Sequence, residues 1–538
     1  MDTKKERYLE AFWYFSVFFF FYIWFSRIHP LVVYDADDWT YLAYVRKTTP
    51  IWGDWNPAKV FPEVVMPFLS TIILHTLVPL TGDYITGFTV GHALIVSGFI
   101  TAYAWCLTNL VRRVFAHSRL TAGLISALFL ILHFLVFRTA DWNNSYLFRC
   151  EDLNCYYNYL IPALLNACIV MLMMHNPRFD QFLLNGNPAA KGLFYAALYL
   201  ALFSNLVVSG ILAAYAGCQL LLSLLKDLKK FRLMDYIKGN TVHLTVLLFW
   251  FISAVFELSG GRAASSSTHS LFYRIRETAY LLKDLLFCCN PYFWLVVIVI
   301  CAGAFLSLLL TRHKEADEKH LLKHLLSICI GGAALLVYML ILCALVSSYY
   351  IYRSEYSFPL FFYGFLIVLL SLGYLLKKHP ALLVILPLLL LFLVGEINTN
   401  GKTFEDSIFS SYGPAVCADI SRDILNQYLE ADAAGLDETI IYVPMHTADP
   451  VNDDNWPHSI VLLHRISNCL YEQGILSRPI QATFVADPAF NLTGEYPQKD
   501  EMNSELGLST FECLYRSWIT WHTDGGDCPI CSAVKSEV

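Results

Sequence analysis

The sequence predicts an α-helical polytopic membrane protein that ends in a small external α/β domain. Of its 538 residues, 57% are hydrophobic and 15% are charged, whereas about a quarter of a soluble domain is charged. The mean hydropathy is +0.50, and the apolar residues gather in long runs, so lipid is the expected solvent for most of the chain. The formal net charge of −7 is small, and we expect no nucleic-acid partner.

The apolar runs set the expected number of spans. Each approaches the ~20 residues that cross ~30 Å of hydrocarbon. They cover 11–28, 84–110, 119–137, 156–175, 192–225, 241–259, 291–311, 325–347, 357–376 and 380–396. The run 192–225 is too long for one span, and we interpret it as two helices broken near Ser204-Asn205 and Ser209-Gly210.

The basic clusters support that break, because Lys and Arg favour cytoplasmic loops. With two helices in 192–225, all five clusters fall on one side. They are Lys4/Lys5/Arg7, Arg112/Arg113/Arg119, Lys226/Lys229/Lys230/Arg232/Lys238, Arg312/Lys314/Lys319/Lys323 and Lys377/Lys378. The predicted topology has about eleven transmembrane helices, a cytoplasmic N-terminus and an external C-terminus.

This topology divides the chain into a transmembrane part, 1–396, and an external soluble part, 397–538. It exposes the segments 29–83, 138–155, 260–290 and 348–356 on the outer face. We expect a cell membrane, although an organelle lumen is topologically equivalent. In the tail, helical spacing at 415–433 and 458–474 alternates with apolar strand patterns at 439–444 and 481–486, which predicts a small α/β domain.

The segment 57–82 is apolar but contains Pro57, Pro62, Pro67 and Pro79. If it crossed the membrane, every later side assignment would invert. We therefore predict that it lies along the interface, ahead of the second true span.

The densest polar signal follows the first span. Asp35, Asp37 and Asp38 place three carboxylates within four residues, near Trp39 and Trp55. Mutual repulsion and partial burial raise carboxyl pKa values, so one of these groups could serve as a general base or bind a divalent cation. The alternatives are a solvated acidic loop and an interfacial aromatic belt.

Later external loops supply both signs of charge. Glu151 and Asp152 lie in one loop, Arg262 in the next, and Arg353 and Glu355 in the last short loop. An arginine near lipid depth needs a partner, and a phosphate suits a guanidinium group. For Arg353 the alternative is an ion pair with Glu355 or a loop carboxylate, and for Arg262 it is snorkelling to the interface.

With a basic N-terminus, one span and the motif Asp35-Ala-Asp37-Asp38-Trp39 in the next loop, the chain resembles the GT-C superfamily of membrane glycosyltransferases. The Tyr352-Arg353-Ser354-Glu355 loop and the external tail are similar to bacterial glucosyltransferase-type members that decorate cell-surface polysaccharides. The resemblance covers roughly residues 1–400 and implies a GT-C-like fold.

The resemblance implies transfer of a sugar from a polyprenyl-phosphate donor to a cell-surface glycan or lipid acceptor, with inversion. It assigns the catalytic base to Asp37 or Asp38, with Asp35 close behind, and donor-phosphate binding to Arg353 and Arg262. Trp39, Trp55, Glu151, Asp152 and Glu355 are our candidates for acceptor and sugar binding. The run of three acids, in place of one clear pair, leaves the base and a possible divalent cation open.

Three other functions fit parts of the pattern. A transporter or flippase of a lipid-linked glycan would use the broken helix at 192–225, but the ionisable residues cluster in external loops instead of mid-span. A glycan polymerase or ligase would be expected to place its catalytic region in a large late loop. An anchoring protein would need fewer spans.

Overall fold

The computed structural model describes residues 3–43, 57–137, 146–175, 187–228, 231–258, 270–310, 316–397, 414–444, 457 and 460–487. Within these residues, nine helices are long and apolar enough to cross a bilayer. Three shorter apolar helices accompany them, at Arg119–Leu135, Pro188–Leu202 and Leu382–Ile397. The helical polytopic architecture is therefore confirmed, and the number of eleven spans stays a prediction.

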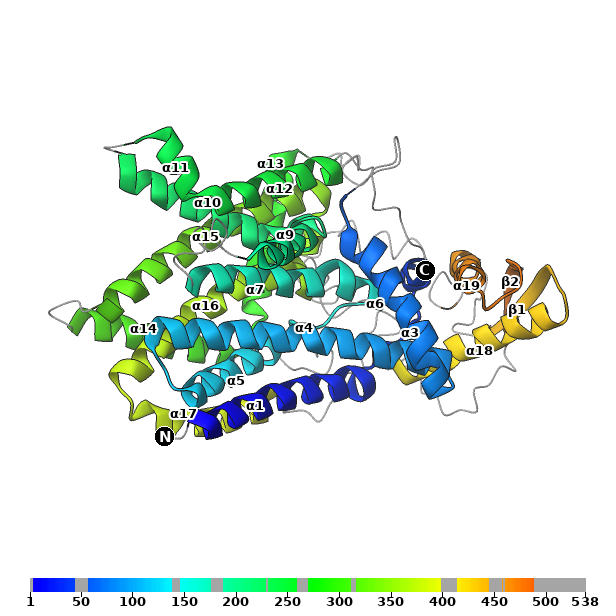
Figure 1. Cartoon of the computed structure of the whole chain (residues 1–538). Helices are drawn as coiled ribbons and strands as arrows, with labels where there is room; N and C mark the ends of the chain where they lie inside the picture. The colour runs from blue at the N-terminus through cyan, green and yellow to red at the C-terminus, as the bar shows by residue number, and fades with distance from the viewer. Residues whose placement is uncertain are drawn as a thin grey trace, which may run out of the picture.

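Most of the described helices form one elongated bundle (Figure 1). They are α1 (Thr3–Ile23) with η1 (Trp24–Ile28), α4 (Tyr84–Phe115), α5 (Arg119–Leu135), α7 (Ile161–His175), α9 (Pro188–Leu202), α10 (Leu206–Asp227), α12 (Thr241–Leu258), α14 (Pro291–Leu310), α15 (Ala316–Val346), α16 (Ser354–Lys378) and α17 (Leu382–Ile397). The shorter elements at the two ends are α2 (Ala36–Ala43), η2 (Phe61–Val65), α3 (Met66–Thr81), α6 (Leu153–Cys155), η3 (Tyr156–Leu160), α11 (Leu233–Gly239), α13 (Leu271–Phe287) and η6 (Ser348–Tyr352).

The predicted break in the run 192–225 is confirmed near Ser204-Asn205, whereas Ser209 and Gly210 lie inside α10. Helix α9 ends at Leu202 and α10 begins at Leu206. Asn205 between them is extended, with φ −149°, and its side chain accepts a hydrogen bond from the N–H of Val207 at 2.9 Å. A side-chain cap satisfies an N–H group that the first turn of a helix leaves without a partner, so a new helix starts here.

Glycines let the central helices approach closely. A Cβ atom on Gly210 of α10 would lie 2.8 Å from the ring of Tyr338, and one on Gly331 of α15 would lie 3.0 Å from the ring of Tyr363. The two tyrosine hydroxyls donate to backbone carbonyls of α10, at 2.9 Å to Leu206 and 2.8 Å to Ile211. Each tyrosine hydroxyl therefore has a hydrogen-bond acceptor, as polar groups inside a protein require.

Ion pairs between partly or fully buried side chains lie at one end of the bundle. Glu10 of α1 pairs with Arg112 at 3.1 Å and with Arg119, and the buried Glu318 pairs with Lys378 at 2.7 Å. The N-terminus, the ends of α4 and α16 and the starts of α5 and α17 all lie at this end (Figure 1). The helix ends that border the basic clusters thus lie together, and the cytoplasmic assignment of that end stays a prediction.

Helix α3 lies at the opposite end, at a steep angle to α4 (Figure 1). By length and composition alone, Phe61–Thr81 could cross a bilayer. However, Val60 before it donates to Phe203 at the α9–α10 break at 3.1 Å, and Asp83 after it caps α4. Both ends of the segment contact elements at one end of the bundle, and its place along the membrane interface stays a prediction.

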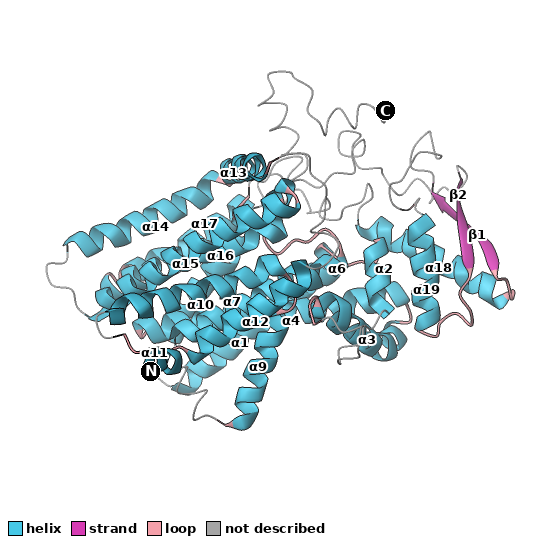
Figure 2. Ribbon diagram, turned by 90° about the horizontal axis from the view of Figure 1, so that it is seen from above, coloured by secondary structure: helices cyan, strands magenta, loops and turns pink. Residues whose placement is uncertain are grey.

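The predicted secondary structure of the tail is found. Helix α18 (Pro414–Ala433), strand β1 (Glu438–Pro444), helix α19 (Ile460–Glu472) and strand β2 (Gln481–Asp487) follow in that order. The strands are parallel, with Glu438 opposite Gln481 and Pro444 opposite Asp487. Figure 2 shows this unit beside α2 and α3. The described tail has only these two strands, and its external location stays a prediction.

The packing of α3 on α4 gives a matched pair of variants. A Cβ atom on Gly87 would lie 2.8 Å from Cα of Val78, whereas one on Gly98 of the same helix meets nothing within 4 Å. We expect Gly87→Ala to destabilise the protein by about 1–3 kcal/mol, because overpacking forces backbone shifts. Gly98→Ala should be neutral or stabilising, since alanine favours helix. Thermal unfolding in detergent would measure both, and equal melting temperatures would contradict this packing.

Candidate functional site

The acidic motif forms the start of helix α2. Asp35 accepts a hydrogen bond from the N–H of Asp37 at 2.8 Å, and Asp38 accepts from the N–H groups of Tyr34 and Asp35 at 3.2 Å each. This reciprocal arrangement satisfies N–H groups that the first turn leaves without helical partners. The aspartates therefore explain why a helix begins here.

Asp38 also joins this motif to a distant segment. Its second oxygen accepts from the N–H of Asn154 at 2.7 Å, and the residue is fully buried. Three backbone N–H groups thus occupy its two oxygens. Of the three predicted catalytic aspartates, Asp38 is the one that faces the protein interior, so its evident role is to fix the loop.

The other two aspartates have different surroundings. Asp37 keeps 47% of its side chain exposed and pairs with Arg465 of α19 at 2.5 Å. Asp35 is partly buried, and its carboxylate accepts from the backbone N–H groups of Ala36 and Asp37 at the start of its own helix. Among the described residues it makes no ion pair, so Asp35 is the member of the motif that neither pairs with an arginine, as Asp37 does, nor joins a distant segment, as Asp38 does.

A fourth acidic residue, Asp152, completes the cluster. Asp152 accepts from the N–H of Cys155 at 2.6 Å and so caps α6. Burial raises the pKa of the Asp152 carboxyl to about 7, and the negative charge of Asp35 contributes. Burial likewise raises the pKa of Asp35, and it raises that of Asp38 well above its usual value, helped by Asp152 and Asp35.

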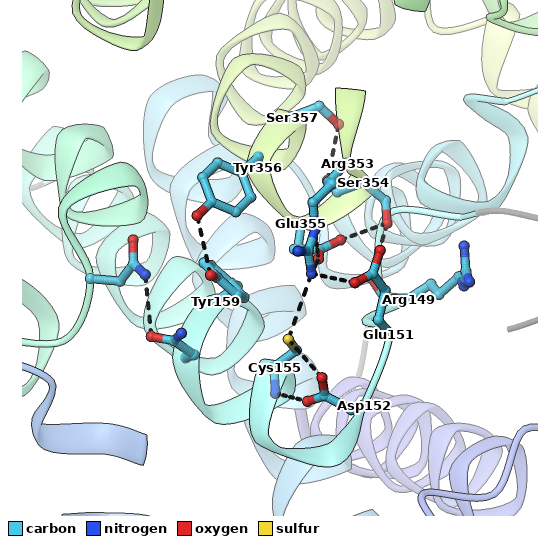
Figure 3. A network of polar contacts seen from close by, with 12 residues as sticks. Arg149, Glu151, Asp152, Cys155, Tyr159, Arg353, Ser354, Glu355, Tyr356 and Ser357 are labelled. Carbon is cyan, nitrogen blue, oxygen red and sulfur yellow. Dashed lines mark hydrogen bonds and ion pairs between the residues drawn. The ribbon is translucent and has the colours of Figure 1, made fainter. Parts of the chain in front are cut away.

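Arg353 lies at the centre of a second cluster (Figure 3). Its guanidinium pairs with Glu151 at 2.6 Å and with Glu355 at 2.5 Å. Only 14% of the Arg353 side chain and 2% of that of Glu355 are exposed. The ion pair with Glu355, the alternative interpretation of Arg353 from sequence, is thus present, together with a loop carboxylate. Two carboxylates balance one guanidinium, which lowers its attraction for a further anion.

The two clusters are connected. The Cys155 thiol donates to Asp152 at 3.3 Å and lies 3.7 Å from a guanidinium nitrogen of Arg353. The single hydroxyl proton of Ser354 has two acceptors within reach, the Arg149 carbonyl at 3.2 Å and Glu355 at 3.1 Å. A continuous polar network therefore runs from the start of α2 to the start of α16, between segments far apart in sequence.

Tyrosines separate Arg353 from an open cleft. The guanidinium carbon lies 5.8 Å from the ring centres of Tyr159, Tyr350 and Tyr356, within the range of cation–π attraction. The hydroxyls of Tyr159 and Tyr356 are 3.1 Å apart. These three tyrosines also line a cleft on the other side from Arg353 that Lys59, Asn158 and Asn205 share.

The structure brings together most of the residues proposed from sequence, but it changes several roles. Trp39 is 1% exposed and stacks on Tyr84, with ring centres 5.8 Å apart. The prediction that Trp39 offers a stacking surface for sugar is therefore wrong in this conformation, because the bulk of the indole is buried between helices. Glu355 is buried against Arg353 and does not face the cleft mouth. Arg262 and Trp55 lie outside the described residues.

No metal site was identified among the described residues, which contain no group of three His, Cys, Asp or Glu side chains placed to hold an ion. The oxygens of Asp38 and Asp152 point at backbone N–H groups instead of converging on one point. The described residues therefore do not provide a set of ligands for the divalent cation that the sequence analysis considered.

Sequence reasoning missed Arg465, the tyrosines around Arg353, and Lys59, which lines the cleft with Asn158. An arginine on an amphipathic helix of the tail gives no signal that it will reach the first loop. Lys59 could have been found, because it is a basic residue on the face that otherwise has few of them.

The Asp152 pKa predicts a pH dependence of stability. A carboxyl whose pKa is higher in the folded than in the unfolded state binds its proton more tightly when folded, so stability falls as pH rises from about 4 to 7. Asp152→Asn mimics the protonated form and should flatten this fall by roughly 1–3 kcal/mol. Unfolding at pH 5 and pH 8 would measure it, and an undiminished slope in the variant would contradict the assignment.

Comparison of the chain with protein-family models, with curated proteins and with solved structures found no match. The functional interpretation therefore depends on the chemistry of the two clusters and the cleft beside them.

Proposed function

We propose that the chain is a membrane glycosyltransferase. It moves a sugar from a polyprenyl-phosphate donor to a glycan or lipid acceptor at the end of the bundle that bears α2, on the external face of the cell membrane. The observation that carries the proposal is the partly buried Asp35, which makes no ion pair with a described residue, on the network that leads to the tyrosine-lined cleft.

Asp35 has the properties of a general base. Burial raises its carboxyl pKa, and a base is most effective when its pKa approaches the working pH. Asp37 is occupied by Arg465 and Asp38 by three N–H groups. The motif thus gives the chemical role to Asp35 and structural roles to its neighbours.

The proposed reaction is a single displacement. The acceptor oxygen attacks the anomeric carbon while its proton passes to Asp35. The bond from the anomeric carbon to the phosphate oxygen breaks, and polyprenyl phosphate leaves with the electron pair. Attack opposite the leaving group inverts the anomeric configuration. The exposed apolar helices around the cleft suit a donor whose lipid stays in the bilayer.

The test is transfer of radiolabelled sugar from polyprenyl-phosphate donors by purified protein in detergent. We expect Asp35→Asn to lower the rate by about 10²–10⁴-fold, as loss of a general base does, with little change in melting temperature. The wild-type rate should rise with pH through the raised pKa of Asp35.

Asp38→Asn and Asp37→Asn serve as matched controls. The first should lower the melting temperature because it weakens the contact to Asn154, and the second should leave most of the activity. Full activity in Asp35→Asn would exclude that residue as the base. No transfer by the wild type from any donor and acceptor would favour the flippase or transporter alternative.

A further inference from the structure

The cleft beside the Arg353 cluster has an unusual lining. Its polar lining residues are Lys59, Asn158, Asn205, Glu257 and the three tyrosines. Its apolar lining residues come from α10, α12 and α15 and are Leu206, Val207, Leu258, Leu342, Cys343 and Val346. A cleft that combines both kinds of residue suits a molecule with a polar head and a hydrocarbon chain.

Lys59 is held at this cleft in an uncommon backbone conformation. Its φ is +54°, a region that residues other than glycine, asparagine and aspartate seldom adopt. Flanking bonds fix it: Tyr199 donates to the Pro57 carbonyl at 3.2 Å, and Val60 donates to Phe203 at 3.1 Å. Such strain persists where surrounding structure over-determines it, and it clusters at ligand sites.

The cleft contains N–H hydrogen-bond donors whose acceptors are not among the described residues. The Lys59 carbonyl accepts from the N–H of Glu63 at 3.1 Å, but the Lys59 ammonium group makes no ion pair or hydrogen bond with a described residue. The Asn158 side chain accepts from Asn205 at 3.2 Å, and its own amide N–H groups donate to no described residue. An ammonium and an amide together supply up to five N–H donors. The α10 N-terminus opens on the same cleft and adds positive potential.

This balance contrasts with that around Arg353. The guanidinium there is already matched by Glu151 and Glu355. The carboxylate in the cleft is Glu257, which can accept hydrogen bonds from hydroxyl groups of a sugar. Of the two cations, Lys59 is therefore the one available to a phosphate.

We propose that this cleft binds a phosphate group borne by an isoprenoid lipid, with Lys59 as its charged contact and Asn158 as a hydrogen-bond donor. The apolar side chains of α12 and α15 contact the start of the hydrocarbon chain. This inference deepens the proposed function by moving the donor phosphate from Arg353 to Lys59, and it rests on that function only for the sugar that the lipid carries.

The test measures binding of farnesyl phosphate to the full chain in detergent, with farnesol and inorganic phosphate as comparison probes. Asparagine tolerates positive φ, so Lys59→Asn removes the charge and keeps the backbone. We expect it to weaken farnesyl phosphate binding about tenfold, the effect of losing one charge-assisted contact, and to leave farnesol binding unchanged. Lys59→Arg should retain most of the affinity.

Lys238→Asn is the matched control, because Lys238 is exposed on α11 at the other end of the bundle. Lys59→Gly, which also accepts positive φ, repeats the charge removal if the asparagine variant is unstable. Unchanged binding in both Lys59 variants, or an equal loss in Lys238→Asn, would overturn the proposal. Inorganic phosphate that binds as tightly as farnesyl phosphate would replace the lipid with free phosphate as the ligand.

The outcome is separable from that of the proposed function. Asp35→Asn should bind farnesyl phosphate with wild-type affinity. If binding depends on Lys59 but the wild type transfers no sugar, the lipid-phosphate site is supported and the transferase proposal is contradicted. If sugar transfer occurs and does not depend on Lys59, the transferase proposal is supported and the lipid-phosphate site is contradicted.

Discussion

The end of the bundle that bears α2 depends on one buried carboxylate. Asp38 accepts hydrogen bonds from Tyr34 and Asp35 on its own loop and from Asn154 on the loop before α7. These contacts fix the loop after the first helix against α6, and α6 leads directly into η3 and α7. An isolated buried charge is costly, and three N–H donors plus a raised pKa offset that cost. The position of Asp35, the cap at Asp152 and the path to Arg353 all follow from this junction.

The second organising principle is charge balance. Arg353 and its two glutamates form a closed unit beneath three tyrosines, so the arginine stabilises the junction of α16 with α6 and η3. Flanking hydrogen bonds hold the backbone at Lys59, and its ammonium group makes no ion pair with a described residue. An anion site needs a cation whose charge is not already matched by carboxylates. Lys59 meets this condition and Arg353 does not, which explains why the proposed phosphate contact is Lys59 and not the more deeply buried Arg353.

The sequence predicted the fold at the level of elements. Apolar runs located the long helices, the Ser204-Asn205 break was visible in the polar residues, and alternating patterns found β1 and β2. The same reasoning predicted that the aspartates of the first loop belong to one site with Glu151, Asp152 and Arg353. It could not tell which aspartate turns inward, because that depends on a contact with Asn154, 116 positions away. Nor could it foresee that Trp39 is covered by Tyr84, since an aromatic side chain near the interface suits a buried and an exposed place equally.

The tail contact has a consequence for how the protein is made. Arg465 reaches Asp37 across 428 positions, and Arg422 reaches Asp83 across 339. The first loop emerges early in synthesis, whereas its partners on α18 and α19 emerge after every membrane span has been inserted. Chain segments fold as they appear, so the acidic motif spends most of biosynthesis without its basic partner. The end of the bundle that bears α2 therefore reaches its final charge balance only in the last stage of assembly, when α18 and α19 of the tail contact it.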